Sequence, residues 1–335
     1  MRKLGIFILG ATLAFGIIFG YNNEITAKAE EKSVYIGGMT AGFTLKTGGA
    51  QIIGTCEVIS EQKTCSPAQN VGLRAGDTIT KVGGIEIESI QELNEIVNKC
   101  KGNALEFEVC RGNETFTVEI EPLKDGNTGR YKIGVLVRDS VSGIGTVTYI
   151  DKETGRFGSL GHTVMGENKR QMQISDGYVY ECSIVGVTKG IRGRAGELRG
   201  LFLNDKQLGN AEKLCNCGIF GQIKENFDTT ELISTVANSS KAKPGEAYIY
   251  STVNGVCPKK YEIEIVKVDK NNRENKNYVI KITDDALIGE TGGIVQGMSG
   301  SPIVQDGKLV GAVTHVFLND PTRGYGISIE TMLQE

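Results

Sequence analysis

The sequence predicts a mainly β chain in which two globular parts follow a short apolar segment at the N-terminus. Glycine is about twice as frequent as in average proteins, at 45 of 335 residues, whereas proline occurs only 6 times. Runs rich in Val, Ile and Thr recur between tight turns, which is typical of short strands. The roughly 300 residues after the apolar segment are too many for one ordinary domain and suit two.

The N-terminal segment is predicted over residues 1–32. Arg2 and Lys3 precede 17 uncharged residues, 4–20, a length between a membrane span and a signal-peptide core. Ala27-Lys28-Ala29 resembles a small-residue cleavage site. A retained membrane anchor is favoured over a cleaved signal segment, and either places the remainder outside the cytoplasm.

The first globular part is expected over residues 33–123. The stretch 66–84, with Gly72-Leu73 and Ala75-Gly76-Asp77, resembles the PDZ pattern of bacterial proteases. A helix is predicted from Ile90 to Cys100 with Ser89 as its cap, followed by strands 105–111 and 115–121.

The PDZ resemblance implies that this part binds a peptide C-terminus. The carboxylate-binding loop is then expected at Gly42, Phe43, Thr44 and Leu45, where free N–H groups would hold the carboxylate. The alternative is a PDZ fold that serves only as a spacer. Residues 125–129 are predicted as the linker to a second part over residues 130–335.

The second part contains a candidate nucleophile in Gly297-Met298-Ser299-Gly300-Ser301-Pro302. Flanking glycines allow a tight turn at Ser299, and the N–H groups of Gly297 and Ser299 can form an oxyanion hole. A glycine-serine hairpin without chemistry is the alternative. Ser301 is the rival nucleophile, but the following proline has no N–H.

Two histidines, His162 and His315, are the only imidazoles in the chain. A serine hydrolase needs a base near its working pH, and His162, among small residues, is the expected one. His315 follows the serine turn on a predicted strand and is interpreted as a substrate-pocket wall or a core residue. A carboxylate to orient the base is expected at Asp284 or Asp285, although such a pair is also typical of a solvated turn.

Three segments, 290–303, 158–162 and 311–321, together resemble the stage IV sporulation protein B family. The resemblance covers nearly the whole chain. It implies a membrane anchor, a PDZ domain and a trypsin-like double β-barrel serine peptidase domain. Carried over by motif, it implies the triad His162, Asp284 and Ser299. The family usually has a proline after that aspartate and this chain has Asp285, so the choice between the two aspartates stays open.

The family resemblance also implies a function. The enzyme would be a serine endopeptidase anchored in the forespore membrane and facing the intermembrane space of the sporangium. It would cleave a regulatory protein, and itself, to signal activation of sigma-factor processing, and self-cleavage would release it from the membrane. The alternatives are an inactive PDZ adaptor and a quality-control protease of the high-temperature-requirement type, in which the peptidase precedes the PDZ domain.

Composition limits the cofactors and partners. The formal net charge is -3 and no basic stripe is present, so nucleic acid is not expected as a partner. The eight cysteines show no repeated Cys-x-x-Cys, so neither a metal nor another cofactor is expected, and their pairing is left open.

Overall fold

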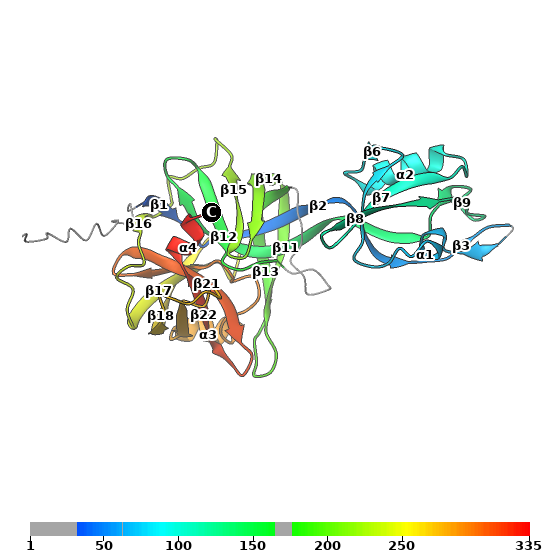
Figure 1. The fold of residues 1–335 in the computed structure, drawn as a ribbon. Helices are drawn as coiled ribbons and strands as arrows, with labels where there is room; N and C mark the ends of the chain where they lie inside the picture. Colours follow the sequence, from blue (N-terminus) through cyan, green and yellow to red (C-terminus); the bar gives the residue numbers. More distant parts are fainter. Residues whose placement is uncertain (1–31, 62, 165–175) are drawn as a thin grey trace, which may run out of the picture. The chain divides into compact units, whose positions relative to one another are not determined.

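A computed structural model describes residues 32–61, 63–164 and 176–335 (Figure 1). The predicted anchor, residues 1–32, lies outside the described residues except for Lys32, which begins the first strand. Within the described ranges, no helix is long and apolar enough to cross a membrane.

The described chain is mainly β, as the glycine and β-branched content predicted. Its strands and helices, in chain order, are β1 (Lys32–Ile36), β2 (Thr40–Thr55), β3 (Val58–Ile59), β4 (Thr64–Cys65), α1 (Pro67–Asn70), β5 (Thr78–Val82), β6 (Ile85–Glu86), α2 (Ile90–Lys99), β7 (Leu105–Arg111), β8 (Glu114–Ile120), β9 (Leu123–Lys124), β10 (Tyr131–Lys132), β11 (Val135–Asp151), β12 (Arg156–Leu160), β13 (Gly177–Thr188), β14 (Glu197–Cys215), β15 (Gly218–Ile223), β16 (Ser234–Ala237), β17 (Gly245–Ser251), β18 (Lys259–Val268), β19 (Tyr278–Ile282), α3 (Asp285–Thr291), β20 (Pro302–Gln305), β21 (Lys308–Phe317), β22 (Asp320–Ser328) and α4 (Ile329–Leu333).

One group of strands closes into a first barrel. The pairing runs from β2 through β13, β14, β15, β12 and β11 and back to β2, antiparallel at every step. Alternate residues of these strands point inward. Phe43, Phe157, Val179 and Ile219 fill the interior and are almost completely buried.

The C-terminal strands close into a second barrel. Its pairing runs from β17 through β18, β19, β22, β21 and β20 and back to β17. Isoleucines dominate its interior, including Ile249, Ile263, Ile280 and Ile303. A separate apolar cluster contains Tyr149 and Phe220 of the first barrel, Ala312 of the second, and Met332 of α4. This shared core fixes the two barrels against each other.

The PDZ part is built between the two long strands β2 and β11 (Figure 1). Its sheet continues from the end of β2 through β5 and β7 to β8, and α2 packs on it through Leu93 and Val97. Helix α2 confirms the predicted helix start: the Ser89 side chain accepts from the N–H of Glu92, and the Glu92 side chain accepts from the Ser89 N–H.

The Ala75-Gly76-Asp77 motif holds this sheet to its neighbouring loop through a buried carboxylate. Asp77 is 1% exposed, and it forms an ion pair with Arg111 of β7, with 2.6 Å between Oδ1 and Nε. The other carboxylate oxygen accepts from the N–H of Arg74 and from Nη2 of Arg111. Because the Arg111 guanidinium and the Arg74 N–H donate to both carboxylate oxygens, the buried negative charge of Asp77 is compensated.

The first strands of the predicted PDZ part also pair with strands of the first barrel. Residues 32–36 pair with β11 and β16, and residues 40–46 pair with β11 and β13, so both stretches belong to the first barrel. The PDZ part is thus an insertion between two strands of a barrel. The predicted linker, 125–129, is the tight turn between β9 and β10, in which the Asp125 carboxylate accepts from the N–H and hydroxyl of Thr128.

The residues of the expected carboxylate-binding loop form part of a strand. Gly42, Phe43, Thr44 and Leu45 lie within β2, between β11 on one side and β13 on the other. Phe43 and Leu45 are barrel-core residues at 2% and 3% exposure. A strand with partners on both edges has no row of free N–H groups, so this stretch cannot capture a peptide terminus.

Candidate active site

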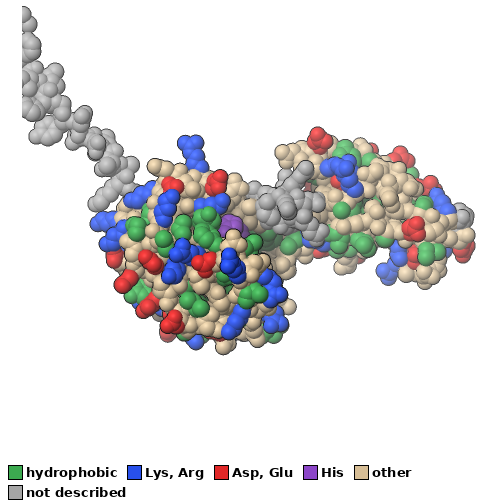
Figure 2. Space-filling view, turned by 90° about the horizontal axis from the view of Figure 1, so that it is seen from below, with side chains coloured by type: hydrophobic (Ala, Val, Ile, Leu, Met, Phe, Trp, Pro, Cys, Tyr) green, Lys and Arg blue, Asp and Glu red, His purple; other side chains and the backbone are tan. Residues whose placement is uncertain are grey.

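His162 is positioned by a sharp turn that ends β12. Leu160 and Gly161 both have φ of +68°, and a Cβ at Gly161 would lie 2.9 Å from Cγ2 of Thr314 and from Cγ2 of Ile327. Glycine therefore lets the chain pass directly beside β21. As a result the imidazole of His162 packs against that of His315, with 4.9 Å between ring centroids. Histidine side chains reach the surface of this part as a purple patch in Figure 2.

The surroundings of the two imidazoles keep both rings neutral. Nδ1 of His162 lies 2.8 Å from the carbonyl oxygen of Thr163, and as the donor in this bond it leaves Nε2 free to accept a proton. Burial lowers the pKa of His162, and the bond to Thr163 only partly opposes this. Desolvation, with a further contribution from His162, lowers the pKa of His315 to about 4.

The nucleophile loop, defined as residues 297–300, needs glycine at both ends. Gly297 has φ of +98° and Gly300 has φ of +94°. A Cβ at Gly300 would lie 2.0 Å from the carbonyl oxygen of Thr146 and 2.6 Å from the N atom of Leu160. No larger residue fits there, so the loop packs tightly against the first barrel.

Strand β11 holds this loop through three hydrogen bonds. The N–H of Thr146 donates to the carbonyl of Ser299 at 2.9 Å, and its Oγ1 donates to the carbonyl of Gly297 at 2.8 Å. The Oγ1 of Thr148 donates to the carbonyl of Gly300 at 2.8 Å. Both threonines are fully buried. Nothing in the local sequence marks them as partners of this loop, although a Thr-x-Thr pair on a strand places both hydroxyls on one face.

The side chain of Ser299 is partly exposed, and its Oγ donates to the carbonyl of Thr314 at 2.7 Å. The Ser299 hydroxyl therefore bonds the carbonyl of the residue next to His315 and not the His162 ring. The rival, Ser301, is fully buried and its Oγ bonds the Oγ of Ser251 at 3.0 Å. Burial excludes Ser301 from contact with a substrate.

The two N–H groups expected to form the oxyanion hole are not used by the described part of the chain. Among the described residues, no acceptor receives the N–H of Gly297 or of Ser299. The N–H of Met298, which lies between them, donates to the carbonyl of Val295, and the N–H of Gly300, which follows them, donates to the carbonyl of Val313. Two N–H groups beside the Ser299 hydroxyl thus remain able to bind a developing oxyanion.

Asp284 does not occupy the position expected of a triad carboxylate. Its Oδ1 accepts from the N–H of Leu287 at 2.9 Å as the N-cap of α3, and its Oδ2 accepts from the N–H of Glu262 at 3.3 Å. Asp285 is exposed in the first turn of that helix. In the described part of the chain neither carboxylate bonds His162, whose Nδ1 is held by a backbone carbonyl instead.

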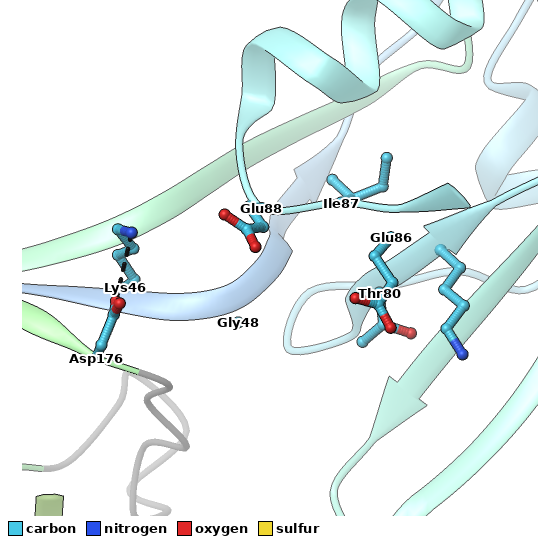
Figure 3. Close-up of a pocket in the computed structure, with 8 residues that line it drawn as sticks. Lys46, Gly48, Thr80, Glu86, Ile87, Glu88 and Asp176 are labelled. Carbon is cyan, nitrogen blue, oxygen red and sulfur yellow. Dashed lines mark ion pairs between the residues drawn. The ribbon is translucent and has the colours of Figure 1, made fainter. Parts of the chain in front are cut away.

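A hollow of about 340 Å³ lies elsewhere, at the end of the PDZ part where α2 begins (Figure 3). Lys46 and Asp176 form an ion pair on one side of it, with 3.5 Å between Nζ and Oδ1. Charged side chains of both signs line most of it, and none belongs to the nucleophile loop or its histidines: Lys46, Gly48, Thr80, Lys81, Glu86, Ile87, Glu88 and Asp176. The hollow is therefore separate from the candidate active site.

One group of side chains in the described part could hold a metal ion. The ligand atoms of Cys215, Cys217 and Glu335 lie within 4.8 Å of one another. Glu335 already pairs with Lys213, and the pKa of the Cys217 thiol is raised by burial, which disfavours the thiolate that a metal requires. None of these residues is in the nucleophile loop.

Comparison with protein families gives two matches. Residues 129–333 match the family described as SpoIVB peptidase S55. Residues 39–121 match the PDZ domain family. The first match contains the nucleophile loop and both histidines, and the second contains α2 and the Asp77 carboxylate.

Similarity to individual proteins is restricted to parts of the chain. The protein named "Putative zinc metalloprotease CPE1693" from Clostridium perfringens is 33% identical over 70 residues, which cover 21% of this chain and 21% of that protein. "Serine protease HTRA1" from Xenopus tropicalis is 27% identical over 117 residues, covering 30% of this chain and 24% of that protein. The crystal structure of the PDZ domain of the SdrC-like protein from Listeria monocytogenes is similar at 22% identity and a TM-score of 0.22, over 27% of this chain and 87% of that one.

Proposed function

The chain belongs to the SpoIVB peptidase S55 family and is a serine peptidase, and from this premise we propose that it is an endopeptidase acting on an extracytoplasmic regulatory protein. The observation that carries the proposal is the convergence at one place of the nucleophile loop with the two histidines. His162 follows β12 of the first barrel, and Ser299 precedes β20 of the second. Such a junction of two barrels is the arrangement of trypsin-like peptidases.

The first chemical step follows from the hydrogen bonds. The Ser299 hydroxyl turns from the Thr314 carbonyl towards Nε2 of His162, the ring nitrogen that the Thr163 bond leaves unprotonated. As Oγ attacks the peptide carbonyl, Nε2 takes its proton and later gives it to the leaving amine. The lowered pKa of His162 keeps the ring neutral, and so able to act as a base, at neutral pH.

Two parts of the site stabilise the charges that form. The free N–H groups of Gly297 and Ser299 receive the oxyanion, and each donor is worth about 3 kcal/mol at such sites. The Thr163 carbonyl accepts from Nδ1 and holds the imidazolium in place. Thr163 thereby takes over the orienting task that sequence reasoning gave to Asp284. Water then hydrolyses the acyl-enzyme, with His162 as the base.

The cellular role is proposed from the family and from the N-terminal sequence. The apolar stretch 4–20 would anchor the enzyme in the forespore membrane, with the peptidase facing the intermembrane space. There it would cleave a regulatory protein and so signal sigma-factor processing during sporulation. The PDZ part would bind a peptide C-terminus of a partner or substrate.

Endopeptidase activity is tested with an unfolded protein substrate. The wild-type chain should cut reduced casein at internal bonds, which mass spectrometry of the fragments identifies. Ser299→Ala should leave casein intact at the same concentration. Cleavage by Ser299→Ala at the same bonds would contradict the assignment of the nucleophile.

Self-release is tested in cells that express the full chain. Residues 21–31 join the apolar stretch to β1 and are rich in small and polar side chains, which suits proteolysis. Wild type should give a membrane-bound form and a shorter soluble form, and Ser299→Ala only the long form. N-terminal sequencing of the soluble form identifies the cut. Equal shortening of both proteins after Ala29 would identify an ordinary signal peptide.

A further inference from the structure

The turn between β14 and β15 brings two thiols into contact. Cys215 ends β14, and Asn216 and Cys217 form the turn. Both cysteines are free thiols, and their sulfur atoms lie 3.0 Å apart. The N–H of Cys217 also donates to Sγ of Cys215 at 3.4 Å. Because a disulfide bond needs about 2.05 Å between its sulfurs, a small movement of the two side chains is enough to join them.

The two thiols differ in their access to solvent. Cys215 is half-buried, whereas Cys217 is 3% exposed and its Sγ donates to the carbonyl of Thr331 at 3.8 Å. Burial raises the pKa of the Cys217 thiol, and the thiolate is the form that attacks a disulfide. Cys215 is therefore the thiol that meets an external reagent, and Cys217 is the one that can react with it afterwards inside the protein.

A carboxylate lies beside both sulfurs. The ligand atoms of Cys215, Cys217 and Glu335 are all within 4.8 Å of one another. Glu335 pairs with Lys213, with 2.5 Å between Oε2 and Nζ, and the hydrogen bond from Lys213 is the main cause that lowers the pKa of the Glu335 carboxyl, against the effect of burial. The carboxyl is thus ionised at neutral pH and can take up the proton that the Cys217 thiol has to lose.

The residue after Cys217 is pressed against the chain that carries the catalytic base. Gly218 begins β15 and pairs with Leu160, the last residue of β12. A Cβ at Gly218 would lie 2.0 Å from the carbonyl oxygen of Ser159 and 3.2 Å from the N atom of Gly161. His162 follows directly. Because the packing leaves no free space here, a shift of the turn is passed on to the residues that position His162.

The same turn also touches the second barrel. Nδ2 of Asn275 donates to the carbonyl of Asn216 at 3.0 Å. The Cys217 side chain belongs to the apolar cluster that the two barrels share, together with Tyr149 and Met332. A bond from Cys217 to Cys215 would draw this sulfur away from Thr331 and from the cluster, so it would change the contact between the barrels as well as the turn.

We propose that Cys215 and Cys217 are a thiol–disulfide exchange site for low-molecular-weight disulfides, and that the oxidised form is a slower peptidase than the dithiol form. The exchange site goes beyond the proposed function. Its effect on the rate rests on that function, since the effect acts through His162 on Ser299.

The exchange has two steps that balance. The Cys215 thiolate attacks one sulfur of the external disulfide, whose S–S bond breaks and releases a first thiol. Cys217 then gives its proton to Glu335, and its thiolate attacks the Cys215 sulfur and releases the second thiol. The two protein thiols are oxidised, and the external disulfide is reduced to two thiols. A disulfide between residues two apart closes a small ring, and strained disulfides of this kind are readily reduced again, which makes the change reversible.

The test uses the reduced full-length protein and oxidised glutathione as the probe. After the reaction, free thiols are blocked and the protein is digested with trypsin. The peptide 214–224 contains Cys215 and Cys217 and no other cysteine, so its mass distinguishes the dithiol, a glutathione adduct and an internal disulfide. We expect the internal disulfide, formed by loss of two hydrogen atoms, and its disappearance after treatment with dithiothreitol.

The rate at which a fluorophosphonate labels Ser299 is measured on the same samples. Oxidation should slow labelling about tenfold or more, because a misplacement of about 1 Å in a catalytic group can cost 10²-fold. Dithiothreitol should restore the original rate. Cys215→Ser, which lacks the attacking thiol, should be labelled at the same rate with and without oxidised glutathione.

Matched variants assign the effect to this pair. Cys257→Ser removes an exposed cysteine outside the turn and should respond to oxidised glutathione as the wild type does. Cys217→Ser keeps a hydroxyl that can donate to Thr331 and should stop at the glutathione adduct on Cys215. Circular dichroism checks that each variant folds, and the peptide mass of the wild type tests the exchange without any variant.

Each remaining outcome addresses one part of the inference. An unchanged dithiol, or a lasting glutathione adduct in the wild type, would overturn the exchange site. An internal disulfide with an unchanged labelling rate would overturn the link to His162. Slower labelling of oxidised Cys215→Ser would assign the effect to other cysteines and would also overturn the link. Absence of labelling in the reduced wild type would contradict the proposed function itself.

Discussion

The substitution Asp284→Asn separates two roles for this carboxylate. In the structure Asp284 caps α3, the helix that leads into the nucleophile loop, and it accepts two backbone N–H bonds. Asparagine has a side-chain oxygen at the same place and caps helices about as well as aspartate. A triad carboxylate behaves differently, since its replacement by asparagine costs about 10⁴-fold in kcat.

The expected magnitudes follow from the bonds. Asp284→Asn keeps the acceptor for Leu287 and should change the free energy of unfolding by only about 0.5 kcal/mol, with activity within about threefold of wild type. Asp284→Ala removes both acceptors and should cost about 1–2 kcal/mol, because a cap is worth about 1 kcal/mol and the Glu262 N–H loses its partner.

Urea unfolding gives the stabilities, and cleavage of a peptide substrate gives the activities. Asp285→Asn, at an exposed residue that makes no cap, is the control. If Asp284→Asn were as stable as wild type but about 10³-fold or more less active, the carboxylate would be required chemically. The active enzyme would then have to bring Asp284 to His162.

Three further predictions concern the base, the loop and the PDZ part. Burial places the pKa of His162 below its ordinary value of 6.5, so the rate of cleavage should reach half of its maximum below pH 6.5, and a half-maximal rate at or above pH 6.5 would contradict this. Below pH 6.5 the folded protein should also lose a little stability, because the unfolded chain binds that proton more readily. Thr148→Val removes the donor to the buried Gly300 carbonyl and should lower the free energy of unfolding by about 1–2 kcal/mol, whereas Thr117→Val, at an exposed strand position, should have little effect in the same urea titration. Asp77→Ala leaves the Arg111 guanidinium without its buried partner and should cost about 2–3 kcal/mol, and an unchanged urea midpoint would show that the ion pair adds nothing.

Local chemistry made much of the fold predictable. Ser89 and Glu92 form a capping box that can be read directly from the sequence, and the strand 105–111 was predicted with the observed bounds. The glycines around Ser299 identified the turn because their positive φ values are otherwise unfavourable. These features depend on residues within a few positions of one another.

The differences between sequence and structure came from long-range pairing. Gly42–Leu45 resemble a PDZ loop locally, but β11 and β13 pair with them from more than 90 residues away in sequence. Thr146 and Thr148 carry no local sign that they bond the nucleophile loop, over 150 residues later. The family motif predicts Asp284 as the triad carboxylate. In the structure this residue begins α3, where its carboxylate caps the helix. Side-chain partners across barrels are set by topology, which a short motif does not specify.

The most direct test of the central claim is the site of fluorophosphonate labelling. The protein is treated with the probe and digested, and mass spectrometry identifies the modified residue. We predict one modified serine, Ser299, with labelling lost in Ser299→Ala and strongly slowed in His162→Ala, and unaffected in Asp284→Asn. Labelling at the buried Ser301, or none in the folded wild-type protein, would contradict Ser299 as the activated nucleophile.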